Sequence, residues 1–449
     1  MHVSVIGTGY VGLVIGACLA KAGHSVLCLD IDQNRIDLLQ KGIVPFYEEN
    51  LEKLVYEGQD KGLLSFSSNY EEAVSHSDLC FLALPTPLLT DGSCSMEALR
   101  LAIERLATLI TNKPFTFVIK STILPGFSTT IQTRLEEISQ SSEATFTLVA
   151  NPEFLREGSA VQDFLYPDRI ILGSINGAPI PKLTALYSSF GISEEKMLWM
   201  TFPSAEMTKY AANTMLASRI SFINEIALLS EKAGADINSV CAGIGADARI
   251  GTHYLKPGIG FGGSCLPKDL ALLRRFAKKI SCPTPLLDSV ELVNNSQKKH
   301  FLKKIETHFQ LSGGLQGKKL AILGLAFKAD TDDIRNSPAC DLVEALLETG
   351  ALLQVFDPKA MQKAFLFFQS GSISWAENEY SAVADTDALL ILTDWPQFKE
   401  LNFIKIHSLM RDFAFFDGRN QFKTEMLTKI GFEYFSIGTP EQKTTLSLL

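Results

Sequence analysis

The sequence predicts an α/β protein with two Rossmann-like, doubly wound domains joined by a central, mostly helical dimerisation region. Strands alternate with helices at both ends of the chain, which indicates the two domains. A glycine-rich turn after the first strand indicates that the N-terminal domain binds a nucleotide, and long helical patterns fill the residues between. We expect the domains at 1–200, 201–312 and 313–449.

Composition is typical of an ordinary globular protein. The 449 residues are 46% hydrophobic and 20% charged, and the net charge of −9 argues against a nucleic-acid-binding surface. The eight cysteines are scattered without a Cys-x-x-Cys pair, so we expect no disulfide framework, no metal site and a cytoplasmic location. We expect no membrane partner, because no apolar stretch approaches a membrane span.

The N-terminus carries a dinucleotide-binding fingerprint. A strand at 3–6 leads into Gly-Thr-Gly-Tyr-Val-Gly (7–12), which opens a helix at 13–22, and a second strand at 25–29 ends on Asp30. A GxGxxG motif in this setting, with an acid closing the next strand, is the full pattern of a nucleotide-binding βαβ unit.

Individual residues of this fingerprint have separate roles. Gly7, Gly9 and Gly12 permit the tight turn and the close approach of a pyrophosphate to the helix N-terminus. Asp30 would bind the ribose hydroxyls and repel a 2′-phosphate, which favours NAD over NADP. Arg35 lies near enough to weaken that preference.

Three further apolar runs, at 79–84, 115–120 and 145–150, each end in a polar or proline-rich turn. Ligands of an open α/β sheet lie beyond the carboxyl ends of its strands. Each residue of these turns could alone be a turn former or a helix cap. Together they are candidate site residues: Thr86, Thr122, Glu153 and Glu157.

The middle of the chain is predicted to be helical at 204–232 and 285–309. Lys209 and Asn213, four residues apart, share one face of the first helix, although a solvated surface lysine is the plain alternative. Asn213 and Asn224 lie on a mostly apolar helix and need hydrogen-bond partners. A long helix between two domains must bury its apolar stripe, so we expect a homodimer or a higher homo-oligomer.

Cys265 lies in the segment Gly-Phe-Gly-Gly-Ser-Cys-Leu-Pro-Lys-Asp (260–269), just before a predicted helix. Pro267 suits a first helical turn, which places the cysteine at a helix N-terminus, where a thiolate is favoured. The alternative is that Cys265 is a small buried hydrophobe, as free cysteines often are.

The last third repeats the alternation without the GxGxxG motif and predicts a second nucleotide fold, with a helix at 339–348 and strands at 319–323, 352–356, 388–392 and 413–416. Lys328, Arg335 and Arg419 follow strands of this fold, where a diphosphate could meet them. Ordinary solvated surface charge is the alternative for each.

Four motifs together resemble the UDP-glucose/GDP-mannose dehydrogenase family in its own order: NPEFLREG (151–158), the Lys209/Asn213 helix, GFGGSCLPKD (260–269) and GLAFK with TDDIR (324–335). The resemblance covers nearly the whole length. It implies oxidation of a sugar C6 alcohol to a carboxylate in two hydride steps, with two NAD and one water consumed. PDRIILG (167–173) favours the UDP-glucose branch, with GDP-mannose or a UDP-N-acetylhexosamine as alternative substrates.

The same resemblance implies the site residues. Cys265 is the nucleophile that forms a thiohemiacetal and then a thioester, while Lys209 and Asn213 stabilise the oxyanion. The other implied catalytic residues are Asp269, which orients Lys209 or the hydrolytic water, Glu153, a general base acting through a water, and Thr122.

The implied cofactor contacts are Gly7, Gly9, Tyr10, Val11, Gly12, Asp30, Arg35, Thr86, Thr122, Glu157, Lys268 and Arg335. The implied substrate contacts are Glu153, Phe154, Leu155, Arg156, Glu157, Lys209, Asn213, Arg249, Tyr254, Leu255, Lys256, Pro257, Gly258, Gly262, Lys328 and Arg419. By the resemblance, Arg249 reaches into a neighbouring subunit's site.

Two other classes of function fit parts of the sequence. A two-electron hydroxy-acid dehydrogenase would share the N-terminal fold and the helical middle but needs no nucleophilic thiol. A nucleotide-sugar sensor without chemistry would leave Lys209, Cys265 and Asp269 idle. The joint presence of these three residues favours the four-electron dehydrogenase.

Overall fold

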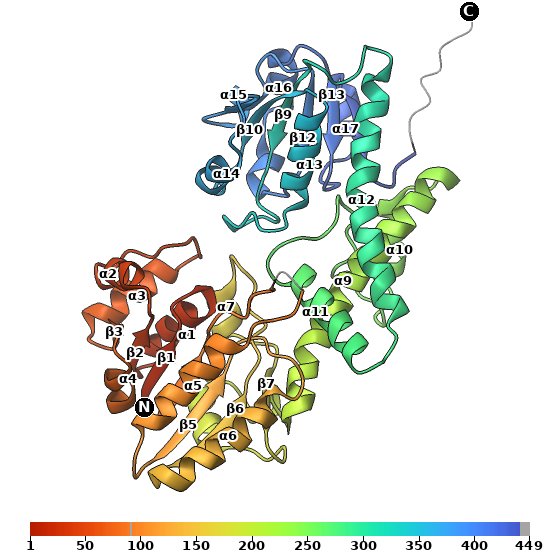
Figure 1. The fold of residues 1–449 in the computed structure, drawn as a ribbon. Helices are drawn as coiled ribbons and strands as arrows, with labels where there is room; N and C mark the ends of the chain where they lie inside the picture. Colours follow the sequence, from red (N-terminus) through yellow and green to blue (C-terminus); the bar gives the residue numbers. More distant parts are fainter. Residues whose placement is uncertain (90–91, 441–449) are drawn as a thin grey trace, which may run out of the picture. The chain divides into compact units, whose positions relative to one another are not determined.

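The computed structural model describes residues 1–89 and 92–440, which form two compact units (Figure 1). The first holds Met1–Ala212 and Lys278–Ile280, and the second holds the rest of the described chain from Asn213 onward. The division falls inside one long helix. The predicted boundaries of three domains, at 200 and 312, stay a prediction, because the two compact units do not test them.

The first unit is built on an eight-stranded sheet with the order β3-β2-β1-β4-β5-β6-β7-β8. Its neighbouring strands run parallel except β6 and β7, which pair antiparallel. The first six strands have the doubly wound order, whose crevice opens beside the first strand. The strands are β1 (His2–Ile6), β2 (Ser25–Leu29), β3 (Leu64–Ser67), β4 (Leu79–Leu82), β5 (Pro114–Ile119), β6 (Thr145–Ala150), β7 (Ile170–Ser174) and β8 (Met197–Thr201).

Helices cover both faces of this sheet, which is why its central strands are nearly continuous apolar runs. One hydrophobic cluster joins α1, α3, α7 and α8 to one face, and another joins α4, α5 and α6 to the other. The helices are α1 (Tyr10–Lys21), α2 (Gln33–Gln40), α3 (Leu51–Asp60), α4 (Tyr70–His76), α5 (Glu97–Leu109), α6 (Phe127–Ser142), α7 (Ala160–Leu165) and α8 (Pro181–Ser188), with a 3-10 turn at Glu194–Lys196.

The second unit contains a six-stranded, all-parallel sheet with the order β11-β10-β9-β12-β13-β14. This is the strand order of the first six strands again, so the predicted second doubly wound domain is confirmed. The strands are β9 (Lys319–Leu323), β10 (Leu352–Phe356), β11 (Ile373–Trp375), β12 (Ala388–Ile391), β13 (Ala414–Asp417) and β14 (Glu433–Ser436).

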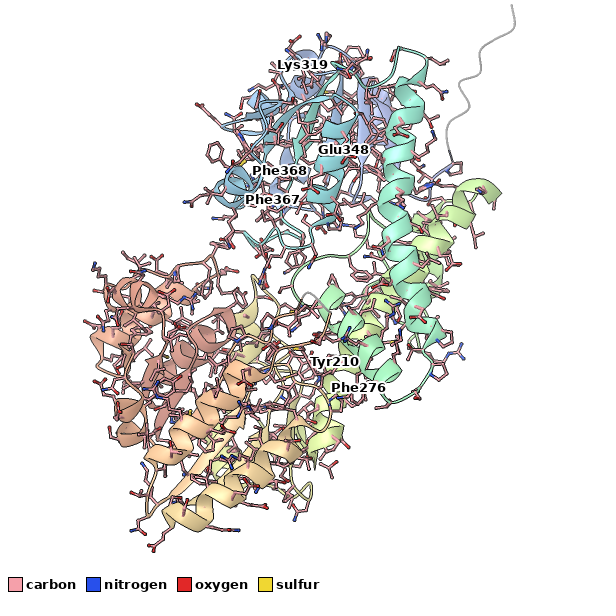
Figure 2. The ribbon with its side chains drawn as sticks, in the orientation of Figure 1. Tyr210, Phe276, Lys319, Glu348, Phe367 and Phe368 are labelled. Carbon is pink, nitrogen blue, oxygen red and sulfur yellow. The ribbon has the colours of Figure 1, made fainter. Side chains whose placement is uncertain are left out.

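Helices pack on this second sheet around one hydrophobic core. Figure 2 draws the side chains of this unit and labels Lys319 at the start of β9 and Glu348 at the end of α13. The helices are α13 (Pro338–Glu348), α14 (Met361–Phe367), α15 (Glu379–Val383), α16 (Phe403–Leu409) and α17 (Thr424–Ile430), with a 3-10 turn at Pro396–Glu400.

The middle of the chain is helical, as predicted. Its helices are α9 (Phe202–Ala233), α10 (Ile237–Gly245), α11 (Leu266–Lys279) and α12 (Pro285–Gln310). Phe301, Ile305 and Phe309 on α12 are buried in the core of the second sheet, so this helix is part of the second unit. In residues 1–89 and 92–440, no helix combines the length and apolar character needed to cross a lipid bilayer.

Candidate active site

The glycine turn between β1 and α1 has the geometry of a phosphate-binding loop. A Cβ at Gly12 would stand 1.9 Å from the carbonyl oxygen of Gly7, so a larger residue cannot stand there. Gly7 itself has φ of 94°, which favours glycine. Around Gly9, by contrast, no atom of the described residues other than Gly9 and its chain neighbours lies within 4 Å of the Cβ position. This open space at the N-terminus of α1 fits the pyrophosphate of a dinucleotide.

Asp30 closes β2 beside this turn. Its Oδ2 accepts hydrogen bonds from the backbone N–H and the hydroxyl of Thr8, both at 2.8 Å, and from Arg35 Nη1 at 2.9 Å. Burial raises the pKa of Asp30. The hydrogen bonds from Thr8, a further hydrogen bond from the Asp32 N–H and the charge of Arg35 outweigh burial and lower the pKa overall. The side chain is therefore an ionised acceptor, as binding of ribose hydroxyls requires.

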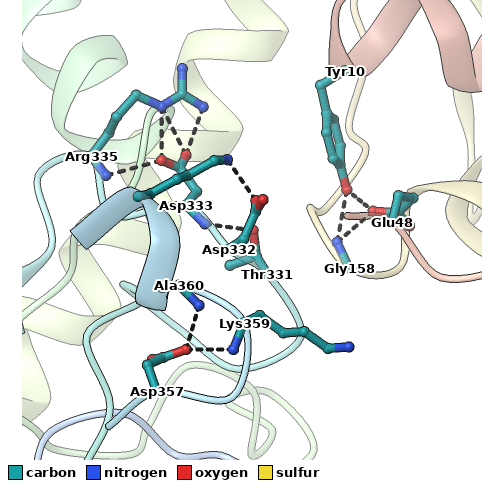
Figure 3. Close-up of polar contacts among 11 residues, drawn as sticks. Tyr10, Glu48, Gly158, Thr331, Asp332, Asp333, Arg335, Asp357, Lys359 and Ala360 are labelled. Atoms are coloured by element: carbon teal, nitrogen blue, oxygen red, sulfur yellow. Dashed lines mark hydrogen bonds and ion pairs between the residues drawn. The ribbon is translucent and has the colours of Figure 1, made fainter. Parts of the chain in front are cut away.

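Tyr10 links this turn to the loop after β6. Figure 3 shows its hydroxyl bonded to Oε2 of Glu48. The Gly158 N–H donates to the Tyr10 hydroxyl oxygen and to Glu48 Oε2, at 2.7 Å each. The second Glu48 oxygen accepts from the Ala160 N–H at 2.7 Å. A buried carboxylate thus holds the end of the NPEFLREG segment against the start of α1. Val11, the next residue of α1, is half-buried.

The turns after β4 and β5 come together, as predicted. The Thr86 hydroxyl donates to the backbone oxygen of Thr122 at 2.9 Å. Glu206 on α9 accepts from the N–H groups of Gly126 and Ser128, at 2.6 and 2.9 Å, and so ties the turn after Thr122 to α9.

Glu153 and Lys209 form a buried ion pair with 3.0 Å between Oε1 and Nζ, and their side chains are 8% and 5% exposed. Lys209 also donates to the Glu153 backbone oxygen at 2.6 Å, while the Leu155 N–H donates to Glu153 Oε2 at 2.6 Å. Burial raises the pKa of Glu153, but Lys209, the Leu155 N–H and the charge of Lys120 together have the larger, opposite effect. The pKa is therefore lowered overall, and the carboxylate is ionised. This pair can orient a polar ligand and accept a proton through a water.

The rest of the loop after β6 varies in exposure. The Phe154 ring lies close to two cations, with Arg169 Cζ at 3.8 Å and Lys209 Nζ at 5.1 Å from its centroid. Arg156 is exposed and pairs with Asp163 at 2.6 Å, whereas Leu155 and Glu157 are half-buried.

Cys265 immediately precedes α11, which confirms its predicted place at a helix N-terminus. Its backbone oxygen accepts from the Asp269 N–H at 2.8 Å, and Asp269 Oδ2 accepts from Asn213 Nδ2 at 2.6 Å. Lys268 Nζ lies 3.5 Å from the other Asp269 oxygen. The start of α11 therefore carries a half-buried cysteine one helical turn before a buried carboxylate, and that carboxylate binds the Asn213 amide.

Other cysteines of the chain differ from Cys265. Cys18, Cys28 and Cys340 are buried in the two cores, and burial raises the pKa of each thiol to about 12. Cysteines of this kind are inert packing residues. Among the described residues, no cysteine forms a disulfide and no cluster of His, Cys, Asp or Glu could hold a metal ion.

Side-chain amides hold the backbone of the glycine loop before Cys265. Asn224 on α9 accepts from the Gly258 N–H at 2.9 Å, and Gln297 on α12 donates to the Gly258 oxygen at 3.0 Å. Asn294 accepts a hydrogen bond from the Phe261 N–H at 2.8 Å and donates one to the Phe261 oxygen at 3.1 Å. A Cβ at Gly262 would stand 2.1 Å from the Asn336 oxygen, so the loop needs glycine there. Asn213 and Asn224 both have hydrogen-bond partners, as predicted, but the buried Nδ2 of Asn224 has none among the described residues.

Residues 249–257 lead into this loop. Arg249 is 89% exposed and pairs with Asp247 at 2.6 Å, so it points away from the core of its own chain. Tyr254 is exposed with φ of 61°, and Lys256 Nζ lies 3.4 Å from Asp394 Oδ2. Leu255 and Pro257 are buried.

Three basic residues of the second sheet have different surroundings. Arg335 is held by both oxygens of Asp333 (Figure 3), and its side chain is 64% exposed. Arg419 donates to the backbone oxygens of Leu392 and Phe327, at 2.7 and 2.9 Å, so its guanidinium joins the segments that follow β12 and β9. Lys328 is half-buried.

Sequence reasoning missed several of these residues. Glu48, Asn294 and Gln297 act by bonds to distant backbone, which leave no local pattern. Lys120 had a signal, because a lysine closes the otherwise apolar run of β5.

Comparison with known proteins identifies the family. Residues 1–191 match the NAD binding domain of the UDP-glucose/GDP-mannose dehydrogenase family, residues 203–296 its central domain and residues 321–424 its UDP binding domain. The chain belongs to the UDP-glucose/GDP-mannose dehydrogenase family. The resemblance found in the sequence is thereby confirmed, as is NAD as the cofactor of this dehydrogenase.

Two UDP-glucose 6-dehydrogenases of this family match nearly the whole chain. The UDP-glucose 6-dehydrogenase TuaD of Bacillus subtilis is 38% identical over 99% of this chain and 94% of its own length. The UDP-glucose 6-dehydrogenase of Rhizobium meliloti is 38% identical over 98% of this chain and 100% of its own length.

Solved structures of family members agree. A UDP-glucose dehydrogenase from Pyrobaculum islandicum superposes with a TM-score of 0.84 at 34% identity, covering 93% of this chain and 94% of that one. A UDP-D-ManNAc dehydrogenase from Pyrococcus horikoshii gives 0.85 at 27% identity, covering 98% and 100%.

Proposed function

We propose that this chain is an NAD-dependent UDP-glucose 6-dehydrogenase, which oxidises the C6 alcohol of UDP-glucose to the carboxylate of UDP-glucuronate. The observation that carries the proposal is the cluster at the start of α11, in which Cys265 adjoins the Asp269–Asn213 pair. A dehydrogenase that removes a single hydride has no need of this thiol. The 38% identity to UDP-glucose 6-dehydrogenases over nearly the whole chain supports the substrate.

Covalent capture explains why a cysteine is needed. NAD bound at the glycine turn and Asp30 would supply the hydride acceptor for both oxidations. The aldehyde formed first has a planar carbon, which cannot give up a second hydride until a nucleophile makes it tetrahedral. Attack by the Cys265 sulfur forms a C–S bond and a thiohemiacetal, and loss of the second hydride leaves a thioester. Water then breaks the C–S bond, releasing the acid and returning the thiol.

Neighbouring residues would handle charge and protons in these steps. The Lys209 ammonium and the Asn213 amide stabilise the sugar oxyanion, for which one donor is typically worth about 10²–10³ in rate. Glu153 accepts a proton through a water, and Asp269 orients the groups around Cys265. Thr122 and the remaining predicted contacts complete the cofactor and substrate sites.

Product stoichiometry tests the reaction. Purified protein with limiting UDP-glucose and excess NAD should yield two NADH per sugar, followed by absorbance. One NADH per sugar with free aldehyde in solution would contradict the mechanism.

The nucleophile is tested by Cys265→Ser. This variant should lose thioester turnover while keeping NAD affinity within about twofold, because the cofactor fingerprint lies elsewhere in the chain. Cys282→Ser, at an exposed cysteine beyond α11, is the matched control and should keep the parent rate. Full activity of Cys265→Ser would remove the assignment.

A second substrate remains a specific candidate, because the Pyrococcus horikoshii neighbour acts on a UDP-N-acetyl sugar, as its name states. A panel of UDP-glucose, GDP-mannose and UDP-N-acetylhexosamines should give the highest kcat/KM for UDP-glucose. A higher value for another sugar would move the proposal to that substrate.

The enzyme is further proposed to be a cytoplasmic homodimer or higher homo-oligomer. Met215, Phe222 and Leu229 on α9, spaced by seven residues, are 63%, 54% and 60% exposed. Residues two turns apart form one stripe along a helix, and an exposed apolar stripe is covered most simply by a second copy of itself. The unpaired, buried cysteines favour a reducing compartment.

A further inference from the structure

Lys120 is a buried lysine at the carboxyl end of β5 to which the proposed reaction gives no role. It is 5% exposed, and its Nζ lies 3.3 Å from Oδ1 of Asn151, which is fully buried. The same Asn151 oxygen accepts from the Tyr187 hydroxyl, and Asn151 Nδ2 donates to the Ile171 backbone oxygen at 2.8 Å. Asn151 is thus fixed in place and presents one oxygen to the ammonium.

Lys120 lies beside the loop that carries Glu153, because the preceding residue Ile119 is paired with Ala150 at the ends of β5 and β6, and Lys120 is bonded to Asn151. Glu153 follows Asn151 by two residues, and the Lys120 charge acts on both members of the pair. The titratable groups that face Lys120 within the first unit are Glu153 and Lys209, together with Tyr187 through Asn151. Two cations and one carboxylate therefore share one buried region, which has one positive charge in excess when all are ionised.

An unbalanced buried charge is unfavourable by itself. Burial lowers the pKa of Lys120 to about 8, although Glu153 acts in the opposite direction. A methionine would fill similar space without that penalty. An excess cation is favourable, however, where a negative charge forms during a reaction, and the turns after β5 and β6 carry Thr122 and Glu153 of the proposed site.

We propose that Lys120 is a positioning residue for the sugar oxidation, which leaves the cluster of Glu153 and Lys209 with one positive charge in excess to balance a sugar oxyanion. The inference rests on the proposed function. Lys120 acts through Glu153 and Lys209 and need not touch the sugar.

The test compares Lys120→Met, which removes the charge, with Tyr187→Phe, which removes the other hydrogen bond to the same Asn151 oxygen and no charge. Turnover of UDP-glucose and NAD is measured from pH 6 to 8. Lys120→Met should lower kcat at least tenfold. It should also increase the ratio of kcat/KM at pH 8 to that at pH 6, because wild type loses the Lys120 charge around the pKa of about 8 and the variant has no such charge to lose. Tyr187→Phe should leave that ratio within the wild-type error.

A second readout needs no substrate. Thermal midpoints of wild type and Lys120→Met are compared between pH 4 and 6. The Lys120–Glu153 attraction exists only when Glu153 is ionised, so the difference should move in favour of wild type as the pH rises. A constant difference, or equal pH profiles of the two variants, would overturn the inference. If wild type oxidises no sugar of the panel while the midpoints behave as expected, the proposed function fails and the charge coupling stands.

Discussion

Gly9 and Gly12 differ in what surrounds them, although both belong to the same motif. A side chain at position 12 would meet backbone of the turn itself, whereas one at position 9 would enter open space. Gly9 has φ of −70° and ψ of −168°, which an alanine adopts without strain. The two glycines therefore serve different ends, the first for ligand approach and the second for packing.

We expect Gly9→Ala to lose NAD affinity and keep its stability. The added methyl occupies the space where a pyrophosphate approaches, so Kd should increase at least tenfold, about 1.4 kcal/mol. Calorimetric titration with NAD and thermal unfolding would measure the two effects. Gly12→Ala is the contrasting variant and should unfold at a lower temperature. A normal NAD affinity of Gly9→Ala would place the cofactor elsewhere.

The stability of the protein should depend on the titration of Lys120. Its pKa is about 8 in the folded chain against 10.5 as the ordinary value, so between these limits the unfolded chain binds more protons. Stability contributed by this group therefore rises with pH, by about 3 kcal/mol in total. Urea unfolding at pH 7 and 10.5 should show wild type gaining that amount relative to Lys120→Met. An equal pH response of the two proteins would contradict the assigned pKa.

At the scale of elements, α9 contributes to several functions at once. Glu206 and Lys209 bind turns of the first unit, while Asn213 and Asn224 bind the segment around Cys265 in the second. The exposed stripe of Met215, Phe222 and Leu229 lies along the same helix. Subunit association at this stripe would therefore act on the helix that carries the proposed oxyanion donors.

Phe222→Lys should dissociate the proposed oligomer. A lysine in the middle of the stripe would be desolvated in an interface and so disfavours association. Phe365→Lys is the matched control, because Phe365 on α14 is 59% exposed against 54% for Phe222. Sedimentation velocity should show a smaller species for Phe222→Lys and the parent species for the control. An unchanged oligomer in both would exclude this stripe as the interface.

At the scale of the whole molecule, the chain repeats one topology twice. Both sheets have the order 3-2-1-4-5-6 over their six common strands, and the pairs β1–β2 and β9–β10 each align five residues in parallel. The first copy keeps the glycine turn, and the second has Gly324-Leu325-Ala326 at the matching strand end. A repeated fold with one altered turn accommodates two different ligands in one chain.

Arg249 provides a prediction for the assembled protein. If it reaches into a neighbouring subunit's site, mixing two inactive variants should restore activity. Hybrids of Arg249→Ala and Cys265→Ser contain one site with an intact cysteine and an arginine supplied by the other subunit. Co-expressed hybrids should show up to about half the wild-type rate per hybrid dimer. Homo-oligomers of each variant mixed without subunit exchange are the control, and failure of true hybrids to regain activity would indicate a self-contained site.

Several strands were predictable from their largely apolar runs, although β7, whose five residues are all buried, was not predicted as a strand. The bounds of β2, β6, β9 and β10 agree with the predicted ones. Peripheral strands such as β3 and β14 were missed. In β3, with the sequence Leu-Ser-Phe-Ser, apolar and polar residues alternate, and β14 begins with a glutamate and has two half-buried residues. Such short, mixed segments resemble turns.

The sequence by itself determined the fold class, the glycine turn with Asp30, and the position of Cys265 at a helix start, because each depends on neighbours within a few residues. Only the tertiary structure decided the pairs Glu153–Lys209 and Asn213–Asp269, whose members are 56 residues apart in each case. The same holds for the excess charge at Lys120. Whether a charged group meets a partner depends on where strands and helices bring distant residues together, and that distance is not written in local spacing.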